Sequence, residues 1–180
     1  MAQRGNPAFR RLFSKNRSKG VETVTLGSSD ILVRRAREDD LPALVALFAA
    51  DALGGHGDTT DRQAFPDYVR AFAVIEASPD QTLYVAERGG EVVGTFQTMI
   101  TTSLTGRGSS AMIVEAVQTR ADMRGQGIGA LMIEFAIAEA KGRGVRLVQL
   151  TSNALRKDAH RFYQRLGFKP SHVGFKMALK

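Results

Sequence analysis

The chain has 180 residues, 43% of them hydrophobic and 24% charged, and a formal net charge of +7 at pH 7. This length and composition predict one soluble globular domain with room for a proper core. The chain contains no cysteine, which excludes disulfides, zinc-thiolate sites and thiol nucleophiles.

The excess positive charge lies at the start of the chain. Residues 1–20 hold six basic residues and no acidic one, which leaves about one net positive charge for the rest. Basicity confined to a tail, rather than spread over a face, disfavours nucleic-acid binding and predicts a flexible tail at residues 1–29 ahead of a domain at residues 30–180. Contact with an acidic partner or nucleic acid, a transit peptide and docking on a neighbouring subunit remain open for this tail.

The domain is expected to begin with a strand at Ile31–Ala36. Asp39 and Asp40 are candidate N-caps for a helix whose apolar positions run from Leu41 to Phe48. A glycine-rich loop over residues 51–60 and a second helical pattern follow.

Three strands are expected before any further long helix. Thr82–Glu87 and Glu91–Thr101 are typical of a hairpin that turns at Gly89 and Gly90. Met112–Thr119 is a β-branched run with one carboxylate, Glu115, set into it. This meander excludes the alternating strand and helix order of an ordinary dinucleotide-binding fold.

A glycine loop then leads into a helix. Arg124–Gly129 has three alternating glycines, and the Ala-rich helical segment Ala130–Ala140 follows directly. A strand, a glycine loop and a helix N-terminus in this order form an anion site, because backbone amides can approach a phosphate closely. The glycine spacing matches neither the dinucleotide fingerprint nor a Walker loop. A diphosphate or phosphopantetheine tail is the first ligand class to consider, and a tight turn without a ligand is the alternative.

The remaining pattern is a strand at Val145–Leu150, a short helix at Asp158–Leu166, and one or two last strands from Phe168 and Gly174–Leu179. The three histidines show no ligand spacing, so no metal is expected. No apolar run reaches the about 20 residues of a membrane span, and nothing resembles a secretory signal. A cytoplasmic protein that does not bind membranes is therefore expected.

Two motifs in this order resemble those of the GCN5-related N-acetyltransferases (GNAT). Arg124–Ala130 resembles the acetyl-CoA signature Arg/Gln-x-x-Gly-x-Gly/Ala, and Ala159–Phe168 resembles the segment Ala-x-x-Phe/Leu-Tyr-x-x-Leu-Gly-Phe. The resemblance covers roughly residues 31–179. It implies an α/β fold with a mixed central sheet of six to seven strands, helices on both faces, and splayed fourth and fifth strands.

The resemblance also implies the ligand and its contacts. Acetyl-CoA would insert its pantetheine at the splay, against Val117 and Thr119, and place its pyrophosphate on the amides of Gly125–Ala130, with Arg124 adding charge. The full set implied for the cofactor is Val117, Gln118, Thr119, Arg124, Gly125, Gln126, Gly127, Ile128, Gly129, Ala130, Asn153 and Tyr163. One position departs from the family, because Arg156 stands where many members have an asparagine that contacts the pantetheine.

Two residues are implied in catalysis of acetyl transfer within a ternary complex. Tyr163 matches the tyrosine proposed as general acid for the leaving thiolate, and partial burial in the core is its alternative role. Glu115 matches a carboxylate proposed as general base, with an ion pair to an arginine as the alternative. In this family the loop and helix between the first two strands line the acceptor side, which would place His56, Asp58 and Asp61 near the substrate. A solvated glycine-rich connection is the alternative for this loop.

The resemblance leaves the acceptor open. A primary amine on a small molecule is the leading class. A peptide N-terminus or a lysine is an alternative, and so is a catalytically silent module that only binds acyl-CoA. A homodimer is compatible with the family, but no residue in the sequence requires one.

Overall fold

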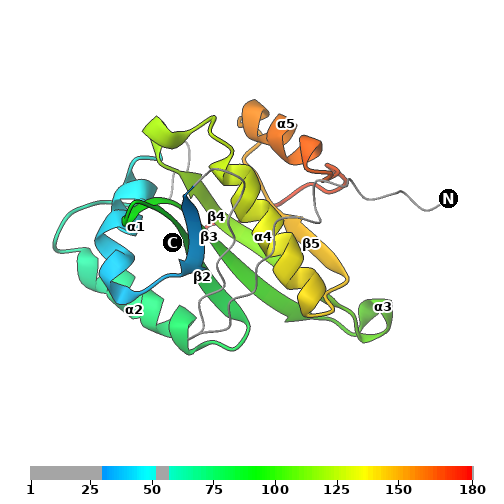
Figure 1. Ribbon diagram of the computed structural model, residues 1–180. Helices are drawn as coiled ribbons and strands as arrows, with labels where there is room; N and C mark the ends of the chain where they lie inside the picture. Colours follow the sequence, from blue (N-terminus) through cyan, green and yellow to red (C-terminus); the bar gives the residue numbers. More distant parts are fainter. Residues whose placement is uncertain (1–29, 52–56, 180) are drawn as a thin grey trace.

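The computed structural model describes residues 30–51 and 57–179. Five strands form one sheet in the order β1-β2-β3-β4-β5 (Figure 1). Their bounds are β1 Ile31–Arg35, β2 Gln81–Arg88, β3 Glu91–Thr102, β4 Ser110–Thr119 and β5 Leu147–Leu150. The first three pairings are antiparallel, and β4 pairs with β5 in parallel, so the sheet is mixed.

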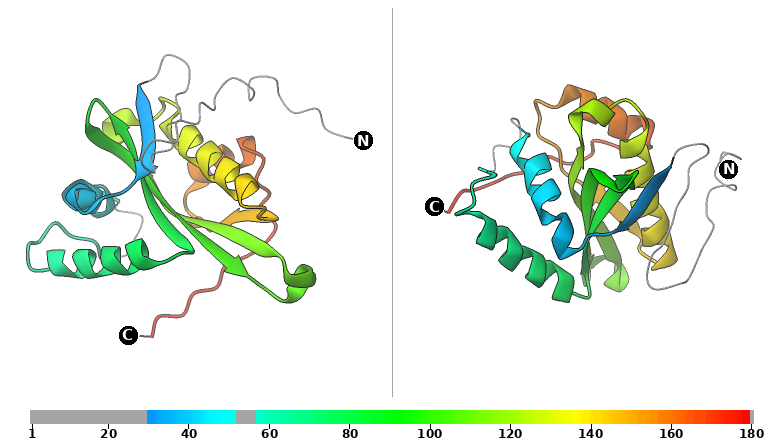
Figure 2. Two further views of the ribbon diagram at one scale, coloured as in Figure 1. Left: turned by 60° about the horizontal axis from the view of Figure 1, so that its bottom comes forward. Right: turned by 60° about the vertical axis from the view of Figure 1, so that its left-hand side comes forward.

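Helices cover both faces of this sheet. Figure 2 shows α1 and α2 on one side of the strands and α4 and α5 on the other. The helix bounds are α1 Leu41–Ala49, α2 Phe65–Ala77, α3 Thr105–Gly108, α4 Ile128–Gly142 and α5 Lys157–Arg165, with short 3-10 turns at Glu38–Asp40 and Ala121–Met123. This order of layers is that of the α/β fold expected from the sequence.

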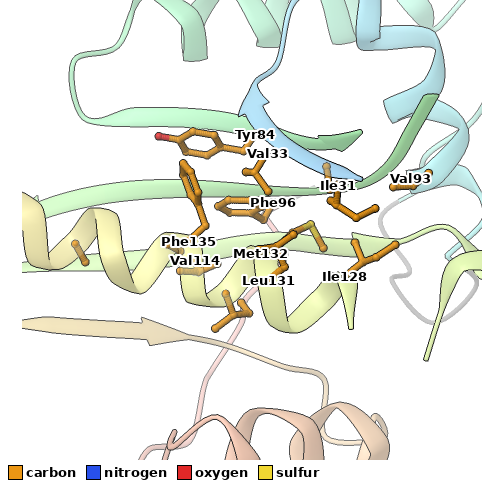
Figure 3. Close-up of a cluster of buried hydrophobic side chains, with 14 of the residues drawn as sticks. Ile31, Val33, Tyr84, Val93, Phe96, Val114, Ile128, Leu131, Met132 and Phe135 are labelled. Carbon is orange, nitrogen blue, oxygen red and sulfur yellow. The ribbon is translucent and has the colours of Figure 1, made fainter. Parts of the chain in front are cut away.

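The main core lies between the sheet and α4 (Figure 3). The rings of Tyr84 and Phe96 stack with centroids 4.9 Å apart, and Phe135 of α4 meets Tyr84 edge-on at 5.1 Å. Met132 and Ile133 of α4 are fully buried. This packing holds the whole of α4 against the sheet, so its N-terminus is fixed relative to the strands.

The hairpin predicted at Gly89 and Gly90 is confirmed, since β2 ends at Arg88 and β3 begins at Glu91. Both glycines have positive φ, +58° and +85°, as the right-handed twist of a two-residue hairpin turn requires. The side-chain cap predicted at Asp40 is not found. Asp40 directly precedes α1 without capping it by its side chain, and its carboxylate instead accepts hydrogen bonds from the Arg34 guanidinium and the Arg37 amide.

The prediction of six to seven strands is wrong for this chain, which has five strands in its described residues. Neither Phe168 nor Gly174–Leu179 belongs to a strand. Apolar residues do alternate there, but none of the five described strands pairs with this segment to complete a ladder. The tail predicted at residues 1–29 and the residue His56 lie outside the described residues, and the boundary between tail and domain stays a prediction.

Candidate active site

The fourth and fifth strands separate halfway along β4. β4 pairs with β5 only over Ala111–Val114, and the last of these pairs is Val114 with Leu150. Glu115–Thr119 continues beyond that point with β3 as its one partner strand. The second half of β4 therefore presents one open edge of backbone groups, which is the splay expected from the sequence.

A β-bulge accompanies the separation. Thr95 pairs with Gln118 and Gln97 with Glu115, so the single residue Phe96 faces two residues of β4. One of these two, Ala116, has φ of +51°, in the left-handed region that alanine rarely enters. A bulge bends the strand that carries it, and backbone strain of this kind is common at functional sites. The bend turns the end of β4 away from the line of β5.

The open edge of β4 carries amide donors. The backbone N–H of Arg120 bonds to the carbonyl of Val93 in β3 at 2.9 Å. Because successive peptide groups of a strand point to opposite edges, the N–H groups of Thr119 and Val117 point away from β3, toward the splay. The Thr119 carbonyl on this edge accepts a hydrogen bond from Arg124 Nε at 3.2 Å. Arg124 is thus held beside Thr119, which was predicted together with it at the cofactor.

The glycine loop ends in a helix start without a side-chain cap. Gly125 and Gly127 have φ of +75° and +84°, and a Cβ on either would meet no atom within 4 Å. Gly127 is the N-cap of α4, no described side chain caps it, and the first intrahelical bond runs from the Leu131 amide to the Gly127 carbonyl at 3.0 Å. The three amides before Leu131 precede the helical ladder and lie at the positive end of its dipole.

Two side chains of this segment contact other parts of the fold. Ile128 is buried in the main core, so only its backbone faces the loop. Gln126 accepts a hydrogen bond from Arg88 at 2.8 Å and donates one to the Asp122 carbonyl at 3.2 Å. These bonds fix the loop to the β2–β3 hairpin, and a ligand contact at the backbone of the loop stays a prediction.

The helix α5 packs onto the start of α4. A Cβ on Gly129 would lie 3.4 Å from the Phe162 ring and 3.8 Å from Thr119 Oγ1, so the absence of a side chain lets these parts approach. The Tyr163 ring stands edge-on to Phe162 and to Phe168. Tyr163 therefore belongs to an aromatic cluster beside the glycine loop.

The Tyr163 hydroxyl forms no hydrogen bond with any residue that the structure describes. Burial raises the pKa of Tyr163, and the nearby Arg156 guanidinium offsets part of that increase. A tyrosine with a raised pKa keeps its proton at neutral pH. The group is thus available to donate a proton.

Glu115 lies on β4 directly before the bulge and pairs with Gln97 of β3. Its side chain is exposed, and within residues 30–51 and 57–179 it forms no ion pair. The arginine partner considered from the sequence is thus not found in this part of the chain. The carboxylate is accessible to solvent at the point where β4 leaves β5.

Arg156 joins the two sides of the splay. Its Nη2 atom lies 2.6 and 2.5 Å from the two carboxylate oxygens of Asp51, which follows α1. The same carboxylate accepts a hydrogen bond from Gln118 Nε2 at 3.2 Å. Sequence reasoning singled out Arg156 as a departure from the family but missed Asp51, because nothing local marks it. Gln118, predicted at the cofactor, uses its side chain in this contact.

The other predicted residues of this region have structural partners. Asn153 accepts the Leu155 amide through its side-chain oxygen at 2.9 Å, which leaves its amide nitrogen for a ligand. Asp58 accepts a hydrogen bond from the Tyr68 hydroxyl, and Asp61 accepts one from the Gln63 amide. Both aspartates thus hold the loop before α2, and a role at the acceptor stays a prediction.

Two further properties of the described residues bear on function. They contain no group of three or more His, Asp or Glu side chains placed to hold a metal ion. None of the helices among them has the length and apolar character needed to cross a bilayer.

Comparisons with known proteins show the family of this chain. A family model described as "Acetyltransferase (GNAT) domain" matches residues 79–170. An aminoalkylphosphonate N-acetyltransferase of Salmonella typhimurium is 40% identical over 119 residues, which cover 66% of this chain and 75% of the relative.

Solved structures resemble the chain over most of its length. A protein of Bacillus halodurans described as a transcriptional regulator is 42% identical with a TM-score of 0.80, covering 83% of this chain and 99% of its own. A Clostridium acetobutylicum protein, described as a predicted acetyltransferase with acetyl-CoA, has a TM-score of 0.64 over 83% of this chain and 96% of its own. At 18% identity, that second likeness concerns the fold alone.

Proposed function

Since this chain belongs to the GNAT acetyltransferase family and is an N-acetyltransferase, we propose that it takes the acetyl group from acetyl-CoA and transfers it to a primary amine of a small molecule. The donor would lie along the open edge of β4, with its phosphates at the start of α4. The amine would attack the thioester directly in a ternary complex, without a covalent enzyme intermediate.

One observation carries the donor part of this proposal. The open edge of β4 after Val114 and the uncapped start of α4 after Gly127 lie next to each other, joined by the Arg124 bond to Thr119. Pantetheine contains two amide groups that can pair with a strand edge, and the pyrophosphate beside it is an anion that suits a helix N-terminus. A single ligand with both parts in this order is a coenzyme A thioester.

The reaction needs a proton acceptor and a proton donor. The amine nitrogen forms a bond to the thioester carbon, and its proton passes to the Glu115 carboxylate, directly or through water. The carbon–sulfur bond then breaks, and the Tyr163 hydroxyl gives its proton to the leaving thiolate. The products are an amide and coenzyme A. Holding the amine against the thioester contributes several kcal/mol of the acceleration.

The acceptor that we propose first is a small primary amine with a phosphonate group. The support is the name of the Salmonella typhimurium relative, 40% identical over two thirds of this chain. A site built to bind a polar group rejects an analogue without that group much more strongly than it rejects a change of one methylene. The phosphonate should therefore contribute to recognition.

The test is release of free thiol from acetyl-CoA with a panel of amines. We expect 2-aminoethylphosphonate to react with a higher kcat/KM than ethylamine or ethanolamine, which lack the phosphonate. A peptide with a free N-terminus is the second arm, and a preference for it would favour the peptide alternative. Binding of acetyl-CoA without thiol release from any amine would favour the silent binding module and contradict the proposed reaction.

A further inference from the structure

The Arg156 guanidinium has donors that its protein partner leaves unused. Its Nη2 atom donates to both carboxylate oxygens of Asp51, at 2.6 and 2.5 Å. In the described part of the chain, Nε and Nη1 of Arg156 donate to no residue, and the side chain is 31% exposed. A guanidinium holds its N–H groups in a planar fork that matches the oxygens of a phosphonate or a carboxylate. Arg156 can therefore bind an anionic ligand while it stays bound to Asp51.

The Asp51 carboxylate fixes where this guanidinium lies. It is 17% exposed and also accepts a hydrogen bond from Gln118 Nε2 at 3.2 Å. Gln118 belongs to the open half of β4, and Arg156 is the N-cap of α5. A side chain that is already held in place loses less conformational entropy when it binds a ligand. The position of the Arg156 fork is therefore set before any acceptor arrives.

The Arg156 fork is near the groups that are proposed to react. Asp51 lies between β1 and β2, in the part of the chain predicted to line the acceptor side. Burial raises the pKa of Tyr163, and the Arg156 guanidinium is close enough to offset part of that increase. Because Tyr163 is the proposed proton donor for the leaving sulfur, an amine that attacks the thioester would lie near both side chains. A short acceptor could thus reach the thioester with its amine and Arg156 with an anionic group.

Two other arginines beside the splay are engaged elsewhere. Arg120 forms ion pairs with two exposed carboxylates, at 2.9 and 2.8 Å. Arg124 bonds to the edge of β4 beside the glycine loop, where the phosphates of acetyl-CoA are proposed to bind. Arg156, in contrast, combines unused donors with a charge that acts on Tyr163. Among these three arginines, Arg156 is the one suited to an anionic group of the acceptor.

We propose that Arg156 binds the phosphonate of the acceptor and selects primary amines that carry such a group. This assignment rests on the proposed transfer of an acetyl group to a small aminophosphonate. The amine would lie between the thioester and Glu115, and the phosphonate would accept hydrogen bonds from Nε and Nη1 of Arg156. Asp51 positions the guanidinium and acts through it, without touching the acceptor.

The first experiment compares two acceptors that differ only in the anionic group. The ratio of kcat/KM for 2-aminoethylphosphonate to kcat/KM for ethylamine measures what the phosphonate contributes. We expect Arg156→Met to lower this ratio about tenfold or more, because charge-assisted hydrogen bonds are lost. The loss should appear in KM for 2-aminoethylphosphonate rather than in kcat, since the phosphonate is bound alike before and during the reaction. Arg156→Lys keeps the charge without the fork and should give an intermediate ratio.

Two matched variants separate ligand binding from loss of the ion pair. Asp51→Asn breaks the same ion pair but keeps the guanidinium and removes a negative charge that repels the phosphonate. Its ratio should therefore stay well above that of Arg156→Met. Arg161→Met removes an exposed arginine of α5 and should keep the wild-type ratio.

The outcomes distinguish this assignment from the proposed function. An equal fall of the ratio in Asp51→Asn and Arg156→Met would indicate a structural role and overturn the assignment, as would an unchanged ratio in Arg156→Met. Either result leaves the proposed acceptor standing when the wild type prefers 2-aminoethylphosphonate. A wild type that shows no such preference would contradict the proposed acceptor, and with it the assignment of Arg156.

The second experiment uses an anion that cannot react. Ethylphosphonate carries the anionic group without the amine. It should inhibit the wild type competitively against 2-aminoethylphosphonate, and it should inhibit Arg156→Met about tenfold or more weakly. Competition against acetyl-CoA instead of the amine would place the anion at the glycine loop. Equal inhibition of the wild type and Arg156→Met would place it away from Arg156, and either result would overturn the proposal.

Discussion

Arg156 and Asp51 form an ion pair between residues 105 positions apart, with one guanidinium nitrogen 2.6 and 2.5 Å from the two carboxylate oxygens. Gln118, near the end of β4, donates to the same carboxylate. The contact joins the end of α1, the open half of β4 and the start of α5. We infer that Arg156 does not make the ligand contact that the family's asparagine makes. It instead connects the end of α1 to the open half of β4 through Asp51.

The ion pair between Arg156 and Asp51 should be measurable as a coupling between the effects of two substitutions on the free energy of unfolding. Asp51→Asn and Arg156→Met should each lower the free energy of unfolding by about 1–2 kcal/mol, because both side chains are partly buried. The double variant should lose less than the sum of the two, since the second substitution removes a bond already broken. Urea unfolding measures this, with Asp158→Asn in the exposed Arg161 pair of α5 as a control without effect. Losses of unfolding free energy that add up in the double variant would contradict a direct interaction between Arg156 and Asp51.

Tyr163→Phe should lower kcat by about 100-fold or more and leave KM for acetyl-CoA nearly unchanged, because in the proposed mechanism the hydroxyl acts only as the thiolate leaves. Burial raises the pKa of Tyr163 above its ordinary value of 10.0. A general acid must be protonated, so wild-type kcat should stay level through neutral pH and fall only above pH 10. The control is Tyr84→Phe, a buried tyrosine of the core, which should lower stability and preserve kcat. Equal kcat in wild type and Tyr163→Phe would remove Tyr163 from the mechanism.

Glu115→Gln should lower kcat/KM for the amine by about 100-fold at neutral pH, because it removes the proposed proton acceptor of the amine. Part of the loss should be recovered as the pH rises and more of the amine is deprotonated in solution. Stability should change by less than about 0.5 kcal/mol, since the side chain is exposed. The matched control is Glu91→Gln, which removes an exposed carboxylate paired with Arg120. A fall in stability without a change in pH profile would indicate a structural role.

The Asp40 carboxylate should determine how the stability of the protein falls at acid pH. Burial acts to raise the pKa of Asp40, but hydrogen bonds from the Arg34 guanidinium and the Arg37 amide outweigh it and hold the pKa below 3.8. A lowered carboxyl pKa contributes stability above the unfolded value, and this contribution is lost as the pH falls below about 3.8. Arg34 also bonds to Glu87 at 2.8 Å, so the pair is part of a buried network.

Asp40→Asn should therefore lower the free energy of unfolding by about 3–5 kcal/mol at pH 7, because it leaves a buried guanidinium without its main partner. The difference from wild type should shrink as the pH falls below about 3.8, because the unfolded wild-type chain then binds a proton at Asp40 that the native state takes up only at lower pH. Urea unfolding at pH 7 and at pH 3 measures both effects. Asp39→Asn, at the exposed neighbouring position, should show neither. A difference that is constant with pH would contradict the role of the Asp40 charge.

The parts of the fold predicted well from sequence depend on local signals. Gly89 and Gly90 mark a turn that needs positive φ, and the glycines before Ile128 mark a helix start, because few other residues adopt those conformations. The apolar character of Leu131–Ala140 predicted a helix packed on a sheet, as α4 is. Each of these signals lies within a few residues of the structure that it predicts.

The parts that sequence reasoning missed depend on distant partners. Alternation at Val173–Leu179 indicates a strand but not the strand beside it, so the count of six to seven strands was too high. The Asp51 carboxylate meets Arg156 across 105 positions, with no pattern in either neighbourhood. The bulge puts Ala116 into a left-handed conformation, and the residue type alanine does not predict that conformation.

The central claim is that acetyl-CoA binds at the splay with its phosphates on the glycine loop, and calorimetric titration with acetyl-CoA tests it most directly. Gly127→Glu would point a carboxylate into the open space before α4, and Gly144→Glu makes the same change at a glycine of similar positive φ at the other end of that helix. Both substitutions carry similar backbone strain. We expect binding to be lost in Gly127→Glu and kept in wild type and Gly144→Glu. No binding by wild type, or equal binding by both variants, would contradict the account.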